Sequence, residues 1–377
     1  MKILLAAATG LWALCSLAGT GVAAEVFSEQ ERTIIQSFGP WPLPSNADPS
    51  NNMSDNNAAI KLGKALFFDK RLSKNNDLSC ADCHDPNNSF VDGRALNSEH
   101  GDAIRNTPSL FNLRWSSWFG WGGEADSLWS QSIRPMQSPE EMALTGEKLR
   151  NLLDEDRVLT SQIQQVFGIS IAVATDEMLF VLIGKLLAAY QETLVSDPTA
   201  FDRFRLTQEA TDLNSNTEFS NSAKRGLKIF IGEGRCFLCH FGPTLSNGEF
   251  GDIGISQFIS KGKIDRGRYA GIKTLKASPF NRLGKYNDNP EKVEKTRTEH
   301  VSLLHKNWGE FKIPSLRSVS KTGPYMHNGS LATLADVVDF YSNLNEERLH
   351  TQGEAILKPL NLSDAEKEDL LSFLRTL

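Results

Sequence analysis

Two short stretches, Cys80-Ala-Asp-Cys83-His84 and Cys236-Phe-Leu-Cys239-His240, decide how this 377-residue chain folds. Each holds two thiols with two residues between them and an imidazole directly after the second thiol. This C-x-x-C-H pattern indicates covalent haem attachment, in which the thiols bind the haem and the His binds its iron. C-x-x-C also occurs in thioredoxin-type and zinc sites, but a His ends both copies, which favours haem. The sequence therefore predicts two covalently bound haem c groups.

The first residues have the pattern of a secretory signal. Lys2 precedes an apolar run over residues 3–17, and small residues lead to Ala24 before the polar Glu25. The run is too short to span a bilayer, and its flanks are typical of a leader that is removed after Ala24. We therefore predict a signal peptide at residues 1–24 and a periplasmic protein that is not integral to the membrane.

The net charge of the chain bears on which classes of partner it can bind. The formal net charge is -6 at pH 7, and no block of Lys and Arg offsets it, which argues against nucleic acid. One basic stretch runs from Lys261 to Lys276. Charge in a Gly-containing loop is common, so we interpret this stretch as a solvated loop, the alternative being a docking surface for an acidic protein.

A short apolar helix precedes each haem motif, over residues 58–68 and again over 226–230, which is a faint internal repeat. The globular fold is expected to begin after a Pro-rich N-terminal extension at residues 25–57. We predict a first cytochrome c-like domain at 58–210 and a second at 211–377. Strand signals are sparse, so the predicted fold class is mainly α, with two cytochrome c-like haem domains and long loops.

Two further segments predict helices. Residues 176–195 are strongly apolar, and since Lys185 interrupts the run we interpret it as buried core rather than a membrane span. Near the C-terminus, Ser363 and Glu366 form a capping-box pattern before an amphipathic helix.

Several motifs resemble the bacterial di-haem cytochrome c peroxidase and MauG family. Leu62-Gly-Lys-Ala-Leu-Phe-Phe-Asp69 resembles the start of that family, and Arg105-Asn-Thr-Pro108 its first-domain signature. Phe311-Lys-Ile-Pro-Ser-Leu-Arg317 and Thr322-Gly-Pro-Tyr-Met-His-Asn-Gly329 resemble its second-domain signature. The resemblance covers nearly all of the chain after the predicted signal peptide. It implies an enzyme that reacts with hydrogen peroxide.

The resemblance also implies catalytic residues. Trp121 matches the aromatic residue between the haems, a relay for electrons. Gln131, Pro135 and Glu141 match the pocket on the peroxide side, with Glu141 as the acid/base residue. A carboxylate near an open iron can take a proton from hydrogen peroxide and return it to the leaving oxygen. By composition alone, Trp121 would be a core residue and Glu141 an acid at a helix start.

Iron ligation follows from the same resemblance. His84 and His240 each bind one iron from one side, and the first iron keeps its other side open. The family's cytochrome c peroxidases have Met as the second ligand of the second iron, whereas MauG-like members have Tyr, here Tyr341. A phenolate favours oxidised iron. Met326 is the alternative ligand, and composition alone would make Tyr341 a core residue of an amphipathic helix.

A calcium ion between the domains is also implied, with oxygen ligands at Asn106, Thr322 and Pro324. His327 would lie near the haems without binding iron. We interpret His100 as an exposed loop residue, the alternative being a counterpart of a movable loop His that the resemblance to the peroxidases implies.

Our leading functional hypothesis is a MauG-like enzyme. Peroxide reacts at the first haem, and the resulting high-valent two-haem state oxidises an aromatic residue, Trp, of a partner protein. Gly120-Trp-Gly-Gly123 and Ser127-Leu-Trp129 resemble the methanobactin-associated branch, whereas much of the family has Trp-Asp-Gly in place of Trp-Gly-Gly. The alternatives are a cytochrome c peroxidase supplied with electrons by a small cytochrome or cupredoxin, and a non-catalytic electron-transfer cytochrome.

Overall fold

The computed structural model describes residues 27–96, 104–208, 219–256, 258–260, 263–289, 294–345, 347 and 357–377. The predicted signal peptide, His100 and Lys261 lie outside these residues. Within them, no helix is long and apolar enough to cross a membrane.

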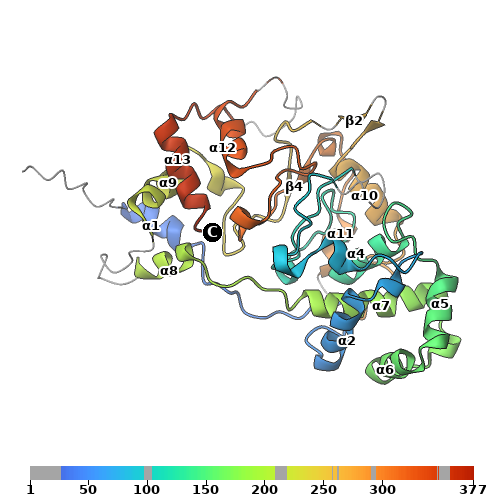
Figure 1. The fold of residues 1–377 in the computed structure, drawn as a ribbon. Coiled ribbons are helices and arrows are strands. Elements are labelled where there is room, and N and C mark those ends of the chain that lie inside the picture. Colours follow the sequence, from blue (N-terminus) through green and yellow to red (C-terminus); the bar gives the residue numbers. More distant parts are fainter. Residues whose placement is uncertain are drawn as a thin grey trace, which may run out of the picture.

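The described chain is mainly α-helical, as predicted, and consists of two lobes (Figure 1). Helices of the first half are α1 (Glu29–Gln36), α2 (Asn57–Phe67), α3 (Cys80–Cys83), α4 (Leu128–Gln137), α5 (Gly146–Glu155), α6 (Arg157–Phe167), α7 (Asp176–Gln191) and α8 (Ala200–Thr207). Those of the second half are α9 (Asn221–Ile231), α10 (Arg268–Ala277), α11 (Glu294–Glu299), α12 (Leu334–Ser342) and α13 (Asp364–Leu374). Strands β1 (Phe250–Gly251) and β4 (Phe311–Lys312) pair antiparallel, as do β2 (Phe258–Ser260) and β3 (Lys263–Ile264).

Helix α7 is the centre of the first lobe and packs against α2 and α4. Its residues from Leu179 onward are buried, as its apolar sequence predicted. A Cβ on Gly184 would lie 2.8 Å from the carbonyl oxygen of Trp129, so the missing side chain lets α4 approach. The single charge inside the run is paired, because Lys185 Nζ lies 2.6 Å from Asp288 Oδ1. A buried ammonium requires such a partner.

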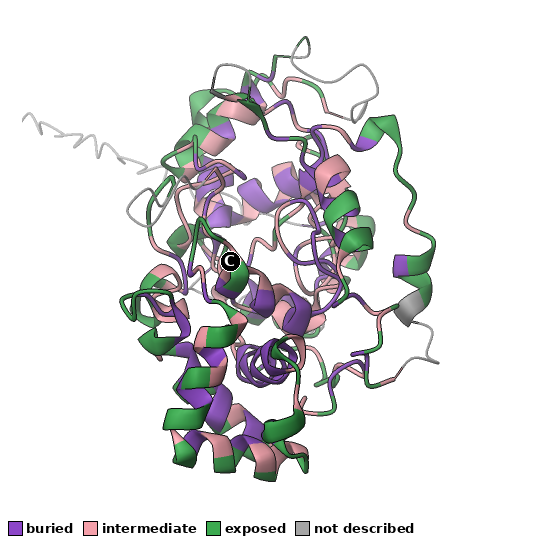
Figure 2. Ribbon diagram, turned by 90° about the vertical axis from the view of Figure 1, so that its right-hand side faces the viewer, coloured by how far each residue is buried: buried purple, intermediate pink, exposed green. Residues whose placement is uncertain are grey.

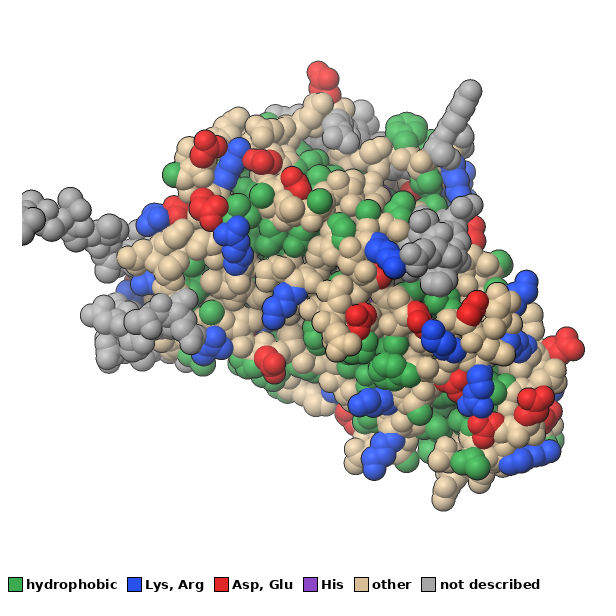
Figure 3. Space-filling view, viewed as in Figure 1, with side chains coloured by type: hydrophobic (Ala, Val, Ile, Leu, Met, Phe, Trp, Pro, Cys, Tyr) green, Lys and Arg blue, Asp and Glu red, His purple; other side chains and the backbone are tan. Residues whose placement is uncertain are grey.

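The second lobe is built on α9 and α13, which pack against each other. A Cβ on Gly226 would clash with the carbonyl of Asp369, so the two helices meet backbone to backbone. The predicted capping box of α13 is present, with the Glu366 carboxylate accepting from Ser363 N at 2.8 Å. Buried positions fill the inner faces of the helices (Figure 2). On the face in Figure 3, acidic and basic side chains are interspersed.

The N-terminal extension differs from the expectation that the globular fold begins after it. Ile35 and Phe38, in and after α1, are fully buried in the core of the second lobe. The chain then runs to the first lobe, where Trp41 Nε1 donates to Ser196 O at 3.0 Å and Asn51 Nδ2 to Lys185 O at 3.1 Å. The extension therefore ties the lobes together. The boundaries of the two haem domains stay a prediction.

Candidate active site

A cavity of about 1130 Å³, lined mostly by apolar groups, lies between the two lobes. Its volume exceeds the roughly 300–1,000 Å³ of an ordinary small-molecule site. All the predicted site residues line it: Cys80, Cys83, His84, Asn106, Trp121, Gln131, Pro135, Glu141, Cys236, Cys239, His240, Thr322, Pro324 and Tyr341. The fold therefore brings together residues that are spread over most of the chain.

Two histidines stand in equivalent surroundings at the cavity wall. The carbonyl of Phe90 accepts from His84 Nδ1 at 3.0 Å, and that of Leu245 accepts from His240 Nδ1 at 3.2 Å. Each bond leaves Nε2 as the nitrogen that can bind a metal. Burial lowers the pKa of both rings, that of His240 to about 4. Both are therefore neutral, which is the form that binds iron.

The thiols of both motifs are half-buried at the cavity wall. Within the described chain, none of Cys80, Cys83, Cys236 and Cys239 is joined in a disulfide. Burial raises the pKa of Cys80 and Cys236 to about 12, so both are protonated thiols in the haem-free chain. The cavity wall thus offers two sets of donors, each with two thiols and one imidazole nitrogen. This donor set and the cavity volume fit two covalently bound haems.

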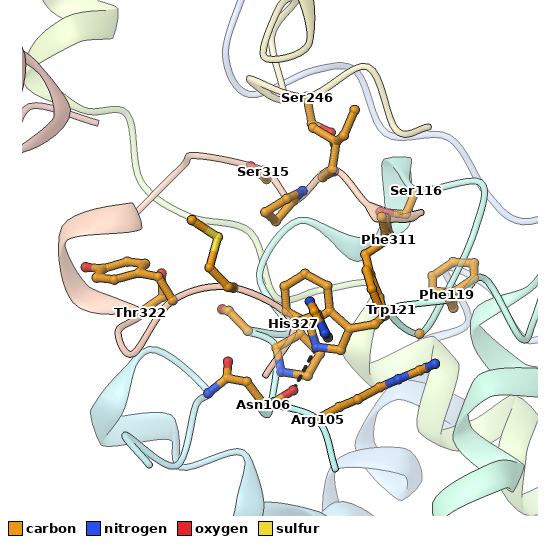
Figure 4. A pocket seen from close by; sticks show the side chains of 18 of the residues that line it. Arg105, Asn106, Ser116, Phe119, Trp121, Ser246, Phe311, Ser315, Thr322 and His327 are labelled. Carbon is orange, nitrogen blue, oxygen red and sulfur yellow. Dashed lines mark hydrogen bonds between the residues drawn. The ribbon is translucent and has the colours of Figure 1, made fainter. Parts of the chain in front are cut away.

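Trp121 is held by both halves of the chain. Its Nε1 donates to the carbonyl of Asn106 at 2.8 Å (Figure 4). Its own carbonyl accepts from Lys312 N of β4 at 2.8 Å. The following Gly122 has no room for the Asp that is frequent in the family. A Cβ there would lie 2.6 Å from Glu124 Oε1 and 2.8 Å from the carbonyl oxygen of Gly267. Close packing therefore explains the departure from the family pattern.

Beside Trp121 lies a buried group of charges. Arg105 binds Asp265 with both its Nε, at 2.6 Å, and its Nη2, at 2.8 Å, and it also contacts Glu124. Burial alone would raise the pKa of Asp265, but Arg105 holds it below its usual range. The ring of His327 stacks on Phe311 with centroids 3.5 Å apart. Burial lowers the pKa of His327 to about 4, so this ring is neutral.

The predicted peroxide pocket comes from α4 and the turn after it. Gln131 accepts from Arg134 Nη1 at 3.0 Å, and Glu141 follows in the turn. Glu141 is exposed to the cavity, yet the surrounding protein desolvates its carboxyl enough to raise its pKa. Arg134 opposes that rise and Glu140 adds to it. Arg134 was not among the predicted residues, although its i, i+3 spacing from Gln131 could have indicated the contact.

Tyr341 lines the cavity from α12, which begins with a capping box formed by Thr333 and Asp336. Burial, and then the thiols of Cys236 and Cys239, raise the pKa of its phenol well above the ordinary value. Tyr341 is therefore close to the second C-x-x-C-H motif. Met326, the alternative ligand, lines the same cavity, and the ligand role of either residue stays a prediction.

The predicted calcium ligands come from both halves of the chain and line one cavity. The side-chain amide of Asn106 donates to Arg94 O at 2.8 Å, and its backbone N to His327 O at 2.7 Å. Thr322 and Pro324 line the same cavity. Among the described residues there is no group of three or more His, Cys, Asp or Glu that could hold a metal. A cation held by these ligands would therefore depend on carbonyl and amide oxygens, which suit calcium.

The expectation of a solvated loop between Lys261 and Lys276 is wrong for its second half. Residues 268–277 form α10, and Arg268 is buried with its guanidinium 4.4 Å from the ring centroid of Trp118. Sequence reasoning also missed Lys312, whose ammonium donates to Trp118 O at 2.7 Å. Burial lowers the pKa of Lys312 to about 8. Both cations lie beside the segment that carries Trp121.

Comparison with known proteins agrees with this geometry. Residues 57–211 match a family model described as di-haem cytochrome c peroxidase. The methylamine utilization protein MauG of Methylorubrum extorquens is 30% identical over 370 residues, which cover 98% of this chain and 91% of that protein. The cytochrome-c peroxidase IdrP2 of Denitromonas iodatirespirans is 31% identical over 323 residues, which cover 84% of this chain and 81% of that protein. The crystal structure of a MauG-like protein associated with microbial copper homeostasis has the same fold, with a TM-score of 0.66 and 24% identity over 90% of this chain and 95% of that one.

Proposed function

Because the chain belongs to the di-haem cytochrome c peroxidase and MauG family, and is therefore a haem oxidoreductase, we propose that it uses hydrogen peroxide to oxidise a Trp residue of a partner protein. The observation that carries this proposal is Tyr341, which lines the same cavity as Cys236, Cys239 and His240 and whose phenol pKa is raised by burial and then by those two thiols. An anionic oxygen ligand stabilises oxidised iron. Such a site stores oxidising equivalents better than it accepts electrons from a small cytochrome.

The haems held by the His84 and His240 motifs would supply one-electron redox chemistry, with hydrogen peroxide as the oxidant at the His84 motif. Glu141 accepts the proton of the incoming peroxide and returns it to the leaving oxygen. Arg134 favours the ionised form of Glu141 and holds Gln131 in place. Trp121, hydrogen-bonded to both halves of the chain, carries electrons across the gap between the haems.

The proposal includes a calcium ion held by Asn106, Thr322 and Pro324, and a periplasmic location. Oxygen ligands from carbonyl groups match this cation, and its position beside Trp121 would fix the relay. Similarity to MauG over 98% of this chain supports a MauG-like activity.

Spectroscopy of purified Tyr341→Phe protein tests the proposal. The wild-type protein should contain one six-coordinate haem, and addition of hydrogen peroxide should yield an oxidised state that persists without a donor. Tyr341→Phe should convert the six-coordinate haem to a five-coordinate one and shorten the life of that state. Tyr325→Phe is the matched control, because Tyr325 lines the same cavity but donates its hydroxyl to Val319 O at 2.9 Å. An unchanged spectrum of Tyr341→Phe would refute the ligand assignment.

A second candidate function is a cytochrome c peroxidase, favoured by the 31% identity to the peroxidase IdrP2. Steady-state turnover with a reduced small cytochrome or cupredoxin distinguishes the two functions. Rapid peroxide consumption with such a donor, abolished by Glu141→Gln, would replace the first proposal with this one.

A further inference from the structure

We propose that Tyr269 and Trp308 form the exit through which oxidising equivalents pass from Trp121 to the partner, and that the basic residues around this pair bind an acidic surface of that partner. The inference rests on the proposed function and adds to it the surface and the charge of the substrate. This inference also assigns a role to the basic stretch from Lys261 to Lys276 that was noted in the sequence.

The pair is a close aromatic contact near the surface. The ring centroids of Tyr269 and Trp308 are 5.4 Å apart at an angle of 50°, which is within the usual range for interacting rings. Both side chains are half-buried, so each has one part inside the protein and one part in solvent. Tyr and Trp are the aromatic side chains that are oxidised at accessible potentials, and both are enriched at protein interfaces.

The protein backbone joins this pair to the Trp121 loop. Helix α10, which carries Tyr269, rests directly on that loop, because a Cβ on Gly271 would clash with the carbonyl of Gly122. The guanidinium of Arg268 donates to the carbonyl of Gly122 at 3.2 Å.

The segment that follows Trp308 also contacts the Trp121 loop. The carbonyl of Glu310, two residues after Trp308, accepts from Arg268 N at 2.7 Å. Lys312 N, two residues further, donates to the carbonyl of Trp121. Both members of the pair are therefore anchored within a few residues of Trp121 by direct backbone contacts.

Cations cover the outer side of the pair. The guanidinium of Arg266 lies 5.2 Å from the ring centroid of Trp308, and Lys273 Nζ lies 5.0 Å from that of Tyr269. We call these two residues, with Lys276 and Lys306, the basic rim; all four are exposed. The segment that holds Lys306, His305–Asn307, packs against α10. The rim stands out in a chain whose net charge is -6.

The rim has an electrostatic consequence for the pair. A positive charge near a ring stabilises the neutral ring relative to its oxidised form. Without a partner, the oxidising equivalents therefore remain on the haems and Trp121. Carboxylates of a docked partner offset the charges of Arg266 and Lys273, which makes oxidation of the pair easier. Docking and electron exit are thereby coupled.

The electron count balances. Hydrogen peroxide takes up two electrons and two protons and yields two water molecules. Each electron leaves the partner's aromatic residue for an oxidised Trp308 or Tyr269, which has itself given one electron toward Trp121. When Tyr269 is oxidised, its phenolic proton goes to solvent and returns on reduction. Two such transfers remove two electrons and two protons from the partner.

The test uses the haem-loaded protein and two synthetic peptides of equal length, one with Trp between Glu residues and one with Trp between Lys residues. The variants are Tyr269→Phe/Trp308→Phe, which removes the oxidisable pair, and Arg266→Gln/Lys273→Gln, which removes two charges of the rim. Trp115→Phe is the control, since Trp115 forms a comparable pair with Trp41, with centroids 5.0 Å apart, and lines the cavity instead of belonging to the Tyr269–Trp308 pair. Readouts are the formation of the peroxide-oxidised state, its decay on mixing with peptide, and the peptide mass.

The oxidised state should form to the same extent in all variants as in the wild type. This measurement also checks that each variant folds. The peptide-dependent part of the decay, after subtraction of the decay without peptide, should slow with the acidic peptide in both double variants. In Arg266→Gln/Lys273→Gln it should slow by roughly tenfold or more, because steering by charge raises association rates by at least that factor. In Tyr269→Phe/Trp308→Phe it should slow because the oxidisable pair is gone. Trp115→Phe should decay like the wild type. Wild-type decay in Tyr269→Phe/Trp308→Phe would refute the exit. Equal reactivity of the two peptides with the wild-type protein would refute the docking surface. If the wild-type protein forms no peroxide-oxidised state, the proposed function itself fails.

Discussion

Arg317 forms a buried ion pair whose loss we expect to destabilise the second lobe. Its side chain is 0% exposed, and its Nη1 and Nη2 bind the two carboxylate oxygens of Asp202 at 2.8 and 3.0 Å. Its Nε donates to Pro243 O at 2.5 Å, and its guanidinium lies 3.6 Å from the ring centroid of Trp41. The side chain thus joins α8, the loop after His240 and the N-terminal extension.

Replacing Arg317 by Met leaves the Asp202 carboxylate buried without its partner, which costs about 3–5 kcal/mol. At about 2–4 °C per kcal/mol for a unit of this size, the melting temperature should fall by roughly 6–20 °C. Burial alone would raise the pKa of Asp202, but Arg317 holds it below the usual range. The pair therefore stabilises the fold above the pKa of an unfolded Asp, and this contribution is lost as the pH falls through the folded pKa.

Thermal unfolding of the haem-loaded protein, followed by circular dichroism between pH 3.5 and 8, measures both effects. The difference between wild type and Arg317→Met should be fully present at neutral pH and begin to shrink only below about pH 4, the pKa of an unfolded Asp. The matched control is Arg375→Met, because the pair of Arg375 and Glu368 has nearly the same length, 2.9 Å, but is 56% and 63% exposed and should contribute at most about 1 kcal/mol. Equal shifts in the two variants, or a difference that does not change with pH, would refute the reasoning.

Three further predictions concern other parts of the molecule. Gly271→Ala should lower the free energy of unfolding by about 1–3 kcal/mol, and with it the melting temperature, because the added methyl group overpacks the contact between α10 and Gly122. It should also slow the decay of the oxidised state, because α10 must move off Gly122. A variant that melts and decays like the wild type would contradict this contact. Burial raises the pKa of Glu192 to about 7, so the folded state is penalised as the pH rises from about 4.5 to 7. Glu192→Gln should therefore stabilise the protein at pH 8 and change little at pH 4.5, measured by urea unfolding. Removal of calcium by a chelator should alter the spectrum of the oxidised state, since the proposed ion lies beside Trp121; full removal, verified by elemental analysis, with no spectral change would exclude that role.

Much of the local structure could be predicted because its causes are local in sequence. Ser363 and Glu366, three residues apart, form the capping box that starts α13 as expected. The apolar run of α7 predicted its burial. The C-x-x-C-H motifs hold their thiols and imidazole within five residues, so their chemistry does not depend on the rest of the fold.

Other features could not be predicted because residues distant in sequence create them. Lys312 and Arg268 approach the segment around Trp118 only after the second half of the chain has packed on the first. The helix α10 was read as a loop because its Gly and charged residues suggested solvent, whereas Gly271 is needed for close packing on Gly122. Arg317 binds Asp202 across more than one hundred residues of chain.

The sequence by itself determined the two haem-binding motifs, the predominance of helices and, through motif resemblance, the family. Tertiary structure decided that Glu141, Trp121 and Tyr341 line one cavity together with both motifs. It alone decided that Tyr269 and Trp308 lie together near the surface beside the Trp121 loop. The physical reason is that attachment motifs and helix caps act over a few residues, whereas a cavity wall, a buried ion pair and a contact between rings depend on which helices pack together.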